Sequence, residues 1–223
     1  MAIDRIELNF MRLPYVHFFE TSFGRSYDRT FIIVRVYEGG VVGYGECVAE
    51  EKPLYSGETT ETAWHILKDF LVPLVFKQGI VEPEDFYTAA KIFKENRMAK
   101  AGLELALWDL KDKKQGLPLY KLYGGIREEI AAGVSAGIEN SIPDLLNMIE
   151  NYRSQGYERI KIKIKPGWDI EVCQAIREKY PELLLQADAN GIYSPEEADH
   201  LRQLDAFKLL MLEQPFPPFD LWE

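Results

Sequence analysis

Along the first part of the chain, apolar and polar residues alternate, which is typical of strands with one buried face. The alternation predicts strands over residues 3–10, 30–37 and 41–48. Pro14 is expected to end the first strand, because proline lacks a backbone N–H. Gly39 and Gly40 lie between the other two and predict a hairpin turn, because glycine adopts positive φ without strain.

Beyond residue 58 the apolar positions recur every three to four residues, as they do on one face of a helix. Helices are predicted over residues 58–76, 83–96 and 98–115. The buried stripe of the last helix is predicted to comprise Met98, Ala101, Leu105 and Trp108, widened by Leu103, Leu107 and Leu110. A sheet followed by helices predicts an α+β domain, which we place at residues 1–125.

The second half alternates short apolar strands with helices. Strands are predicted over residues 131–138, 159–165, 183–187 and 208–212. Helices are predicted over residues 141–155 and 168–180 and from Ser194 onward, where Ser194 and Glu197 form a capping box. Strands that alternate with helices in this way are typical of βαβ units and predict a parallel sheet. The predicted fold class is therefore α/β, with a second domain at residues 126–223.

Each of the four predicted strands of the second half ends in a polar residue. These residues are Ser135, Lys163, Asp188 and Glu213, separated by 28, 25 and 25 positions. A nearly constant period of this size indicates a repeated βα unit. In a β/α barrel the carboxyl ends of the strands meet at one mouth, where reacting groups collect. The spacing therefore predicts that a hydroxyl, an amine and two carboxylates surround one cavity.

Three lysines alternate with isoleucines in the segment Lys161-Ile162-Lys163-Ile164-Lys165. In a strand the lysines share one face and the isoleucines the other. One interpretation is a solvated edge strand. The parallel pattern favours another, in which helices cover the isoleucines and Lys161 and Lys163 point into the barrel while Lys165 lies in solvent. A buried lysine beside another cation has a lowered pKa, so Lys163 is a candidate base.

Asp188 and Glu213 would repel each other on adjacent strands unless a cation lies between them. Oxygen ligands suit Mg²⁺ or Mn²⁺, so the two acids are candidate metal ligands. The alternative is that Asp188 caps the next helix, whereas Pro215 makes a helix start after Glu213 doubtful. We interpret His17, His65 and His200 as structural or surface residues, since they join no ligand pattern and zinc is not expected.

Composition excludes several classes of function. With 26 basic and 36 acidic residues, the net charge of −10 argues against a nucleic-acid binder that works by bulk charge. The longest apolar run spans seven residues, 70–76, with Pro73 inside it, so no membrane segment is expected. Two cysteines cannot form a disulfide framework, and no export signal is expected at the start of the chain, so we expect a cytoplasmic protein.

The motifs RIKIKIKPGWD, QADAN and LEQP, after an α+β domain, resemble the muconate-lactonizing subgroup of the enolase superfamily. The segments PYVHFFETSFGRSYDRTFIIVRV, VGYGECVAEEKPLYSGET and GVSAGIENSIPDLL resemble its o-succinylbenzoate synthase and N-acylamino acid racemase branch. The resemblance implies a capping domain followed by a (β/α)7β barrel, of which this chain holds about four strands.

The resemblance also implies roles for individual residues. Lys163 would be the acid/base catalyst and Lys161 its partner in the KxK motif, while Asp188 and Glu213 would bind Mg²⁺. Phe19, Tyr55, Ser135 and Asn190 would contact a small carboxylate substrate, with residues 19–26 in a loop that closes the site. The full enzyme would be a homo-oligomer.

The period of 25 positions places the next two strand ends near residues 238 and 263, and the resemblance implies that these strands would supply a third metal ligand and a second lysine. We therefore expect the chain to be a fragment of a longer enzyme. The expected reaction is the Mg²⁺-dependent dehydration that forms o-succinylbenzoate in menaquinone biosynthesis. N-acylamino acid racemisation is the alternative, dipeptide epimerisation a weaker one, and a non-catalytic half-barrel an alternative from another class.

Overall fold

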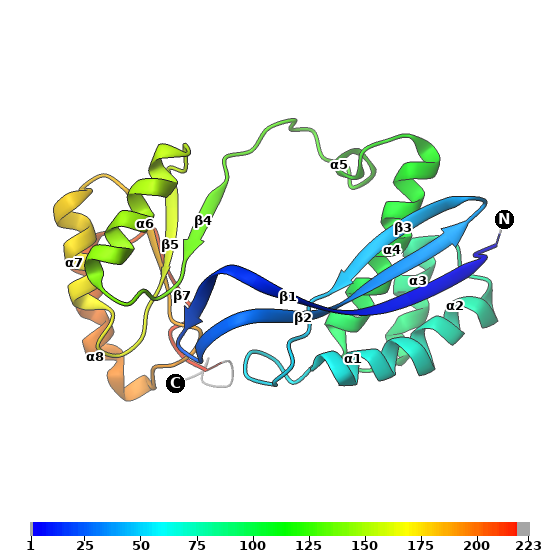
Figure 1. Cartoon of the computed structure of the whole chain (residues 1–223), viewed down its shortest axis with the longest axis horizontal. Helices are drawn as coiled ribbons and strands as arrows, with labels where there is room; N and C mark the ends of the chain where they lie inside the picture. Colours follow the sequence, from blue (N-terminus) through cyan, green and yellow to red (C-terminus); the bar gives the residue numbers. More distant parts are fainter. Residues whose placement is uncertain (1, 218–223) are drawn as a thin grey trace. The chain divides into compact units, whose positions relative to one another are not determined.

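The computed structural model describes residues 2–217, which form two compact units (Figure 1). The first unit comprises the residues up to Tyr15 together with Asp28–Glu128. The second comprises Val16–Tyr27 together with the residues from Glu129 onward. The chain therefore enters the second unit twice, first through the short segment Val16–Tyr27, which we call the strap, and then through its second half.

The first unit contains a sheet in the order β1-β2-β3, formed by β1 (Arg5–Thr21), β2 (Gly24–Glu38) and β3 (Val41–Cys47). Strands β2 and β3 pair antiparallel from Glu38 opposite Val41 to Ile32 opposite Cys47. The turn between them uses Gly39 and Gly40 at φ 56° and 82°, values that suit a two-residue hairpin turn. The hairpin prediction is confirmed.

The sequence predicted that Pro14 ends the first strand, but the structure contradicts this prediction. Strand β1 continues through Pro14 to Thr21. Because β1 lies at the edge of the sheet, proline can occupy a position whose N–H would not be needed for pairing. The longer strand is what carries the chain into the strap.

The helices of this unit are α1 (Thr60–Ile66), α2 (Val72–Gln78), α3 (Pro83–Ala89), α4 (Arg97–Gln115) and α5 (Leu119–Leu122), with a π-helical turn at Leu67–Leu71 and a 3₁₀ turn at Ala90–Ile92. The predicted helix over residues 58–76 is therefore two α-helices joined by π-helix. Pro73 explains the break, because proline lacks the N–H of an α-helical bond and its ring crowds the preceding turn.

Helix α4 packs closely on strand β3. A Cβ atom on Gly45 would lie 2.0 Å from the carbonyl oxygen of Gly102, so only glycine permits this approach. The predicted stripe was wrong in part: Leu105 is 44% exposed and Ala101 is exposed as well, whereas the residues it missed on the buried face are Ala99, Gly102 and Ala106. Small residues mark the true contact face, because they let the helix backbone approach the strand.

The second unit contains a parallel sheet in the order β4-β5-β6-β7, formed by β4 (Gly133–Ala136), β5 (Arg159–Lys163), β6 (Leu184–Asp188) and β7 (Met211–Glu213). Helices α6 (Ile142–Ser154) and α7 (Ile170–Lys179) connect successive strands. This is the α/β arrangement with a parallel sheet that the sequence predicted. The predicted helix from Ser194 has its capping box but consists of short pieces, namely α8 (Ala198–Leu201) between the 3₁₀ turns Pro195–Glu197 and Arg202–Phe207.

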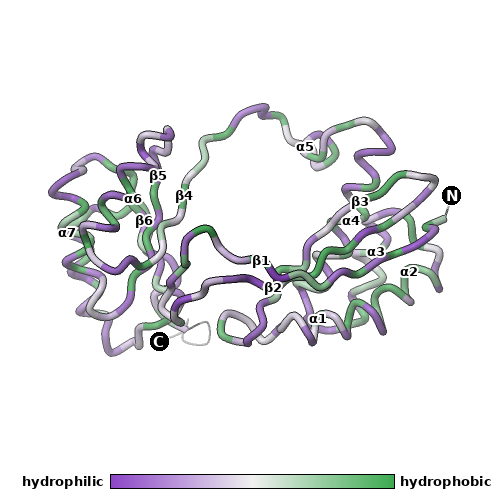
Figure 2. Tube along the Cα trace, viewed as in Figure 1, coloured by the Kyte–Doolittle hydropathy of each residue, from purple (hydrophilic) through white to green (hydrophobic). Residues whose placement is uncertain are grey.

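One face of this sheet forms the core of the unit, and basic residues alternate with isoleucines along β5 (Figure 2). Ile160, Ile162 and Ile164 are fully buried in a cluster with residues of α6 and α7, including Leu145 and Val172. The isoleucines of the KIKIK segment therefore pack against helices, as predicted. The alternation of side chains along β5 then places Lys161 and Lys163 on the opposite face.

Candidate functional site

Lys163, Asp188 and Glu213 stand side by side at the carboxyl ends of three adjacent strands. The register pairs Lys163 of β5 with Asp188 of β6, and Asp188 with Glu213 of β7. The three residues are the last of their strands, so the period of 25 positions in the sequence corresponds to one step across the sheet. The sequence prediction that these side chains lie together is in agreement with this register.

Lys163 is held by two oxygen atoms. Its Nζ donates to Asp188 Oδ2 at 2.6 Å and to Asn190 Oδ1 at 2.9 Å. Lys163 is only 8% exposed and Asp188 only 1% exposed. A charge-assisted hydrogen bond in such a buried setting is short and strong. The amine is therefore kept at the carboxyl edge of the sheet and out of bulk solvent.

Lys161 lies between the two acids. Its Nζ lies 2.9 Å from Glu213 Oε2 and 3.1 Å from Asp188 Oδ2. Burial lowers the pKa of Lys161. Its hydrogen bonds to Glu213 and Asp188 raise the pKa by more than burial lowers it, so the net pKa is raised. The cation that the adjacent acids require is therefore, in this structure, the Lys161 ammonium group.

The pKa of Asp188 reflects the same arrangement. Burial raises the pKa of this carboxyl, and hydrogen bonds from Lys163 and Lys161 lower it, with a net value below its ordinary range. Its other oxygen, Oδ1, accepts the backbone N–H of Asn190 at 3.0 Å. Asp188 is thus an ionised carboxylate with both oxygens engaged.

The sequence suggested that Ser135 and Lys163 occupy equivalent positions at their strand ends. In the structure Ser135 does not lie level with Lys163. The register places it opposite Lys161, two residues lower on β5. The reason is the first separation of 28, where a true register step would be 26. By the same offset the residue level with Lys163 is Gly137. The Ser135 hydroxyl is nevertheless buried, and it has no hydrogen-bond partner among residues 2–217.

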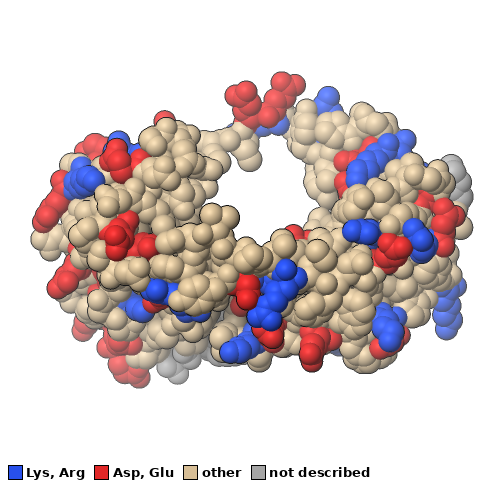
Figure 3. Space-filling view, in the orientation of Figure 1, with Lys and Arg blue, Asp and Glu red and all other residues tan. Residues whose placement is uncertain are grey.

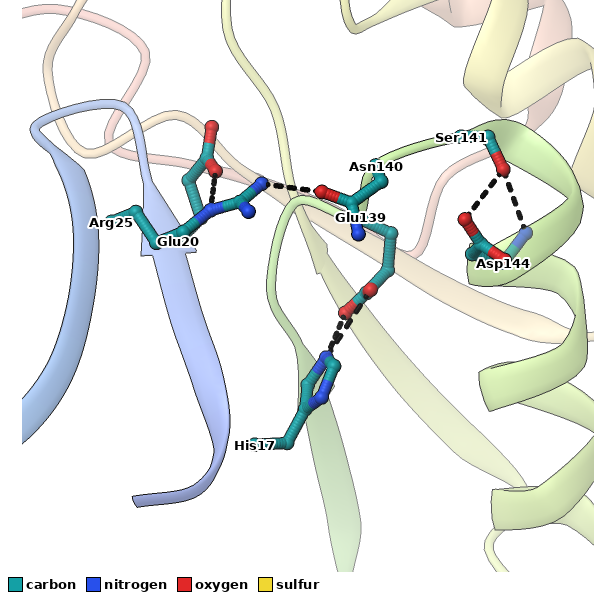
Figure 4. Close-up of polar contacts among 7 residues, drawn as sticks. All are labelled: His17, Glu20, Arg25, Glu139, Asn140, Ser141 and Asp144. Atoms are coloured by element: carbon teal, nitrogen blue, oxygen red, sulfur yellow. Dashed lines mark hydrogen bonds and ion pairs between the residues drawn. The ribbon is translucent and has the colours of Figure 1, made fainter. Parts of the chain in front are cut away.

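The strap is tied to the end of β4 by a polar network (Figure 4). His17 Nε2 lies 3.0 Å from Oε1 of the buried Glu139, and Arg25 bonds both Glu20, at 2.6 Å, and Asn140, at 2.9 Å. The backbone N–H of Ile138 also donates to the carbonyl of Glu20 at 2.9 Å. These bonds hold the strap against the segment that follows β4.

Phe19 lies in this strap, beside the level of Lys163. A Cβ atom on Gly137 would lie 3.3 Å from Phe19 Cδ2 and 3.2 Å from the backbone of Glu20. The lack of a side chain at Gly137 therefore lets the strap approach the end of β4. Tyr55, the other aromatic candidate, lies in the first unit and is 61% exposed.

The sequence predicted that Lys165 lies free in solvent, but the structure gives it an acidic partner. It lies beyond the end of β5, but its Nζ donates to Glu20 Oε1 at 2.9 Å. Glu20 thereby joins Lys165 and Arg25. Burial raises the pKa of Glu20, and hydrogen bonds from Lys165 and Arg25 lower it, leaving the net pKa below its ordinary value. Sequence reasoning missed this pair because 145 positions separate its residues.

Sequence reasoning also missed the buried carboxylate of Asp169. Asp169 is 4% exposed, accepts the backbone N–H of Ile170 at the start of α7, and binds both Tyr193 Oη at 2.7 Å and His200 Nε2 at 2.8 Å. Asp169 lies at the start of the helix predicted over residues 168–180, where aspartate is a common cap, and this was the available signal. The group fastens the segment after β6 to α7. The three histidines each pair with an acid, in the pairs His17–Glu139, His65–Asp69 and His200–Asp169.

The donor set at the strand ends is compatible with a magnesium ion but incomplete for one. Asp188 and Glu213 present carboxylate oxygens around one cationic group, which is the environment that a hard divalent cation prefers. Within residues 2–217 no group of three or more histidine, cysteine, aspartate or glutamate side chains has the arrangement of a metal site. The two acids can therefore form part of such a site, with further oxygen ligands from elsewhere.

Acidic and basic side chains are interspersed on the surface in view (Figure 3). Throughout the described residues, every helix is too short or too polar to cross a membrane.

Comparisons with known proteins agree with the two-part organisation. Residues 6–124 match the mandelate racemase / muconate lactonizing enzyme N-terminal domain, and residues 144–223 match the enolase C-terminal domain-like family. The chain is 45% identical to an o-succinylbenzoate synthase of Geobacillus stearothermophilus, over 98% of this chain and 59% of that protein. It is 43% identical to an N-succinylamino acid racemase of Thermus thermophilus, over 99% of this chain and 60% of that protein.

A solved structure of an enolase superfamily member from Listeria innocua superimposes with a TM-score of 0.89 at 38% identity. The match covers 97% of this chain and 59% of that one. The chain thus spans about three fifths of the length of the curated relatives that it matches. Because both domain matches fall in order along the sequence and the strand-end residues lie together, the chain belongs to the mandelate racemase / muconate lactonizing enzyme family of the enolase superfamily.

Proposed function

We propose that this chain carries the base and two metal ligands of an o-succinylbenzoate synthase. The observation that carries the proposal is the buried amine of Lys163, 2.6 Å from Asp188 at the carboxyl edge of a parallel sheet. Active sites of β/α barrels lie at that edge. The likeness to several o-succinylbenzoate synthases favours this reaction among those of the family.

Lys163 removes a proton from the carbon next to the substrate carboxylate. As a base Lys163 acts in its neutral form, in which its two N–H groups donate to Asp188 and Asn190 and its lone pair takes the third position and accepts the substrate proton. Lys161 adds positive charge beside the same acids. Asp188 and Glu213 would hold Mg²⁺ or Mn²⁺, whose positive charge would stabilise the enediolate of the substrate. The ammonium group formed on Lys163 then returns its proton to the β-hydroxyl, which leaves as water and completes the dehydration.

Substrate contacts are proposed for four residues. The unpartnered hydroxyl of Ser135 and the amide of Asn190 would offer hydrogen bonds, and Phe19 in the strap would offer an apolar surface. Tyr55 is the proposed contribution of the first unit, which we propose to be a capping domain over residues 1–125. In this proposal the four parallel strands are the first four of a (β/α)7β barrel, whose remaining strands would provide the third metal ligand and a second lysine.

The alternative function is racemisation of N-acylamino acids, favoured by the likeness to the Thermus thermophilus racemase. Both reactions begin with the same proton removal, so Lys163 serves either. A non-catalytic half-barrel is the alternative from another class. The free thiols of Cys47 and Cys173 are buried, which supports a reducing, cytoplasmic location for the protein. We also propose that the full enzyme is a homo-oligomer.

The test uses the enzyme that contains this chain, with Lys163→Ala and Asp188→Asn variants. We expect Lys163→Ala to lower turnover by about 10²- to 10⁴-fold while Mg²⁺ binding persists. We expect Asp188→Asn to weaken Mg²⁺ binding first. Dehydration of 2-succinyl-6-hydroxy-2,4-cyclohexadiene-1-carboxylate and racemisation of N-succinylamino acids are assayed side by side. Full turnover by Lys163→Ala, or equal loss of Mg²⁺ binding in both variants, would contradict the assigned roles.

A further inference from the structure

Asn190 has a backbone conformation that asparagine adopts at a cost. Its φ is 51°, in the left-handed region, and the next residue, Gly191, is also left-handed at 73°. Glycine occupies this region without strain, whereas other residues do so rarely and asparagine is among the most tolerant of them. The loop itself would therefore accept a glycine at position 190, and the asparagine side chain requires a separate explanation.

The side chain of Asn190 makes one contact that glycine could not make. Its Oδ1 accepts a hydrogen bond from Lys163 Nζ at 2.9 Å, and the residue is 7% exposed. Because an ammonium group can only donate, the amide oxygen rather than the amide nitrogen must face Lys163. The backbone N–H of Asn190, by contrast, binds Asp188 and would remain in any variant.

Lys163 needs such a second contact. A lysine side chain has four rotatable carbon–carbon bonds, so a single bond to Asp188 leaves the amine free to turn about that contact. Asp188 ends β6 and Asn190 follows two residues later in the loop, so the two side chains approach the amine together. The two acceptors define its direction, and the third position, an N–H in the ammonium form and the lone pair in the neutral base, then has one orientation.

We propose that Asn190 is a positioning residue, whose amide oxygen orients the Lys163 amine toward the substrate carbon. The inference rests on the proposed role of Lys163 as the base, and it assigns to Asn190 a task separate from any contact with substrate. If the Asp188 carboxylate binds another partner, the amide oxygen still holds the amine. Precise placement of a reacting group contributes to rate because it removes unproductive orientations.

Three variants of the 223-residue chain separate the side chain from the backbone. Asn190→Gly keeps the left-handed loop and the backbone N–H but removes the acceptor. Asn190→Asp keeps an oxygen acceptor and tolerates the same φ. Gln214→Gly is the matched control, because Gln214 is also left-handed, at φ 44°, and directly follows Glu213 at the same edge of the sheet.

The readout is NMR of lysine Nζ groups in chain labelled with ¹⁵N- and ¹³C-lysine, with Lys163 assigned from a Lys163→Arg variant. In the unaltered chain and in Gln214→Gly we expect a Lys163 resonance that is protected from hydrogen exchange. Asn190→Gly should exchange about tenfold faster, as the loss of one hydrogen bond to a charged group allows. Asn190→Asp should restore the protection, and thermal melting should show all variants folded.

An unchanged Lys163 resonance in Asn190→Gly would overturn the proposal. So would equal loss of protection in Gln214→Gly, because loop conformation alone would then explain the effect. These results are independent of turnover. If Lys163→Ala retained turnover in the complete enzyme while Asn190→Gly lost the protected resonance, the proposed function would fail and the positioning contact would stand.

Discussion

The ammonium group of Lys161, on β5, donates a hydrogen bond at 2.9 Å to Glu213, which lies on β7 beyond the intervening strand β6. Asp188, on the strand between them, lies 3.1 Å from the same nitrogen. One lysine therefore contacts two acids that the proposed function assigns to a metal ion. On that proposal, the lysine and a divalent cation would compete for the same oxygens.

Replacing Lys161 by alanine should strengthen Mg²⁺ binding to the 223-residue chain. We expect about a five- to tenfold gain in affinity, since removing one partly exposed ion pair is worth about 1 kcal/mol. Isothermal titration with MgCl₂ measures the change, and Lys179→Ala on the exposed side of α7 serves as the control. Weaker binding in Lys161→Ala would mean that the lysine orders the two acids rather than competing for them.

Replacing Ser135 by alanine should stabilise the fold and weaken substrate binding. The Ser135 hydroxyl is buried and has no partner among residues 2–217, so its removal should raise the free energy of unfolding by about 1 kcal/mol. Urea unfolding of the chain measures stability, and KM of the complete enzyme reports on substrate binding. Ser154→Ala, at the exposed end of α6, is the control. A stability loss in Ser135→Ala would show that the hydroxyl has a structural partner.

Replacing Glu20 by glutamine should remove a pH-dependent part of the stability. The pKa of Glu20 lies below its ordinary value of 4.5, because hydrogen bonds from Lys165 and Arg25 outweigh burial. The ionised form therefore stabilises the fold above about pH 4.5, and this contribution disappears as the pH falls through the lowered pKa of the folded state.

The stabilities of the unaltered chain and Glu20→Gln, measured by thermal melting, should differ by about 1 kcal/mol at pH 7, and the difference should shrink as the pH falls through the lowered pKa of folded Glu20. Glu178→Gln, whose carboxylate bonds only Gln174 among the described residues, is the matched control. A difference between the curves that stays constant from pH 7 to pH 3 would exclude the ion pairs as its source.

Replacing Arg177 by methionine should destabilise the second unit strongly. The guanidinium group donates to five backbone carbonyls, those of Tyr180, Pro181, Leu183, Phe207 and Lys208. Losing these bonds should lower the free energy of unfolding by about 3 kcal/mol, because partly buried carbonyls would lose a charged donor. Arg177→Lys should recover only part of this, since an ammonium group cannot reach both chain segments at once.

Chemical denaturation measures the Arg177 effect. Arg202→Met is the control, because its side chain is 74% exposed and bonds only Asp199 among the described residues. We expect the control to change stability by less than about 0.5 kcal/mol. Equal effects in both variants would contradict a stabilising role of the Arg177 hydrogen bonds to the backbone.

The local pattern of the chain determined the two halves, the hairpin at Gly39 and Gly40 and the parallel strands. Alternation along the KIKIK segment was enough to assign Ile162 and Lys163 to different environments, because successive side chains in a strand point to opposite faces. The period of 25 positions placed Asp188 and Glu213 beside Lys163, because one βα unit returns the chain to the same edge.

Tertiary structure decided the rest, wherever the outcome depended on distance in space or on small shifts in register. The separation of 28 positions concealed that Ser135 pairs with Lys161, since the step from β4 to β5 is 26 positions and Ser135 therefore lies two residues below the level of Lys163. The partner of Lys165 could not be predicted, because Glu20 lies 145 positions away on a strand that passes through Pro14. Only the folded chain showed that Lys161 supplies the positive charge between Asp188 and Glu213, because side chains of one sheet face meet whatever their order in the sequence.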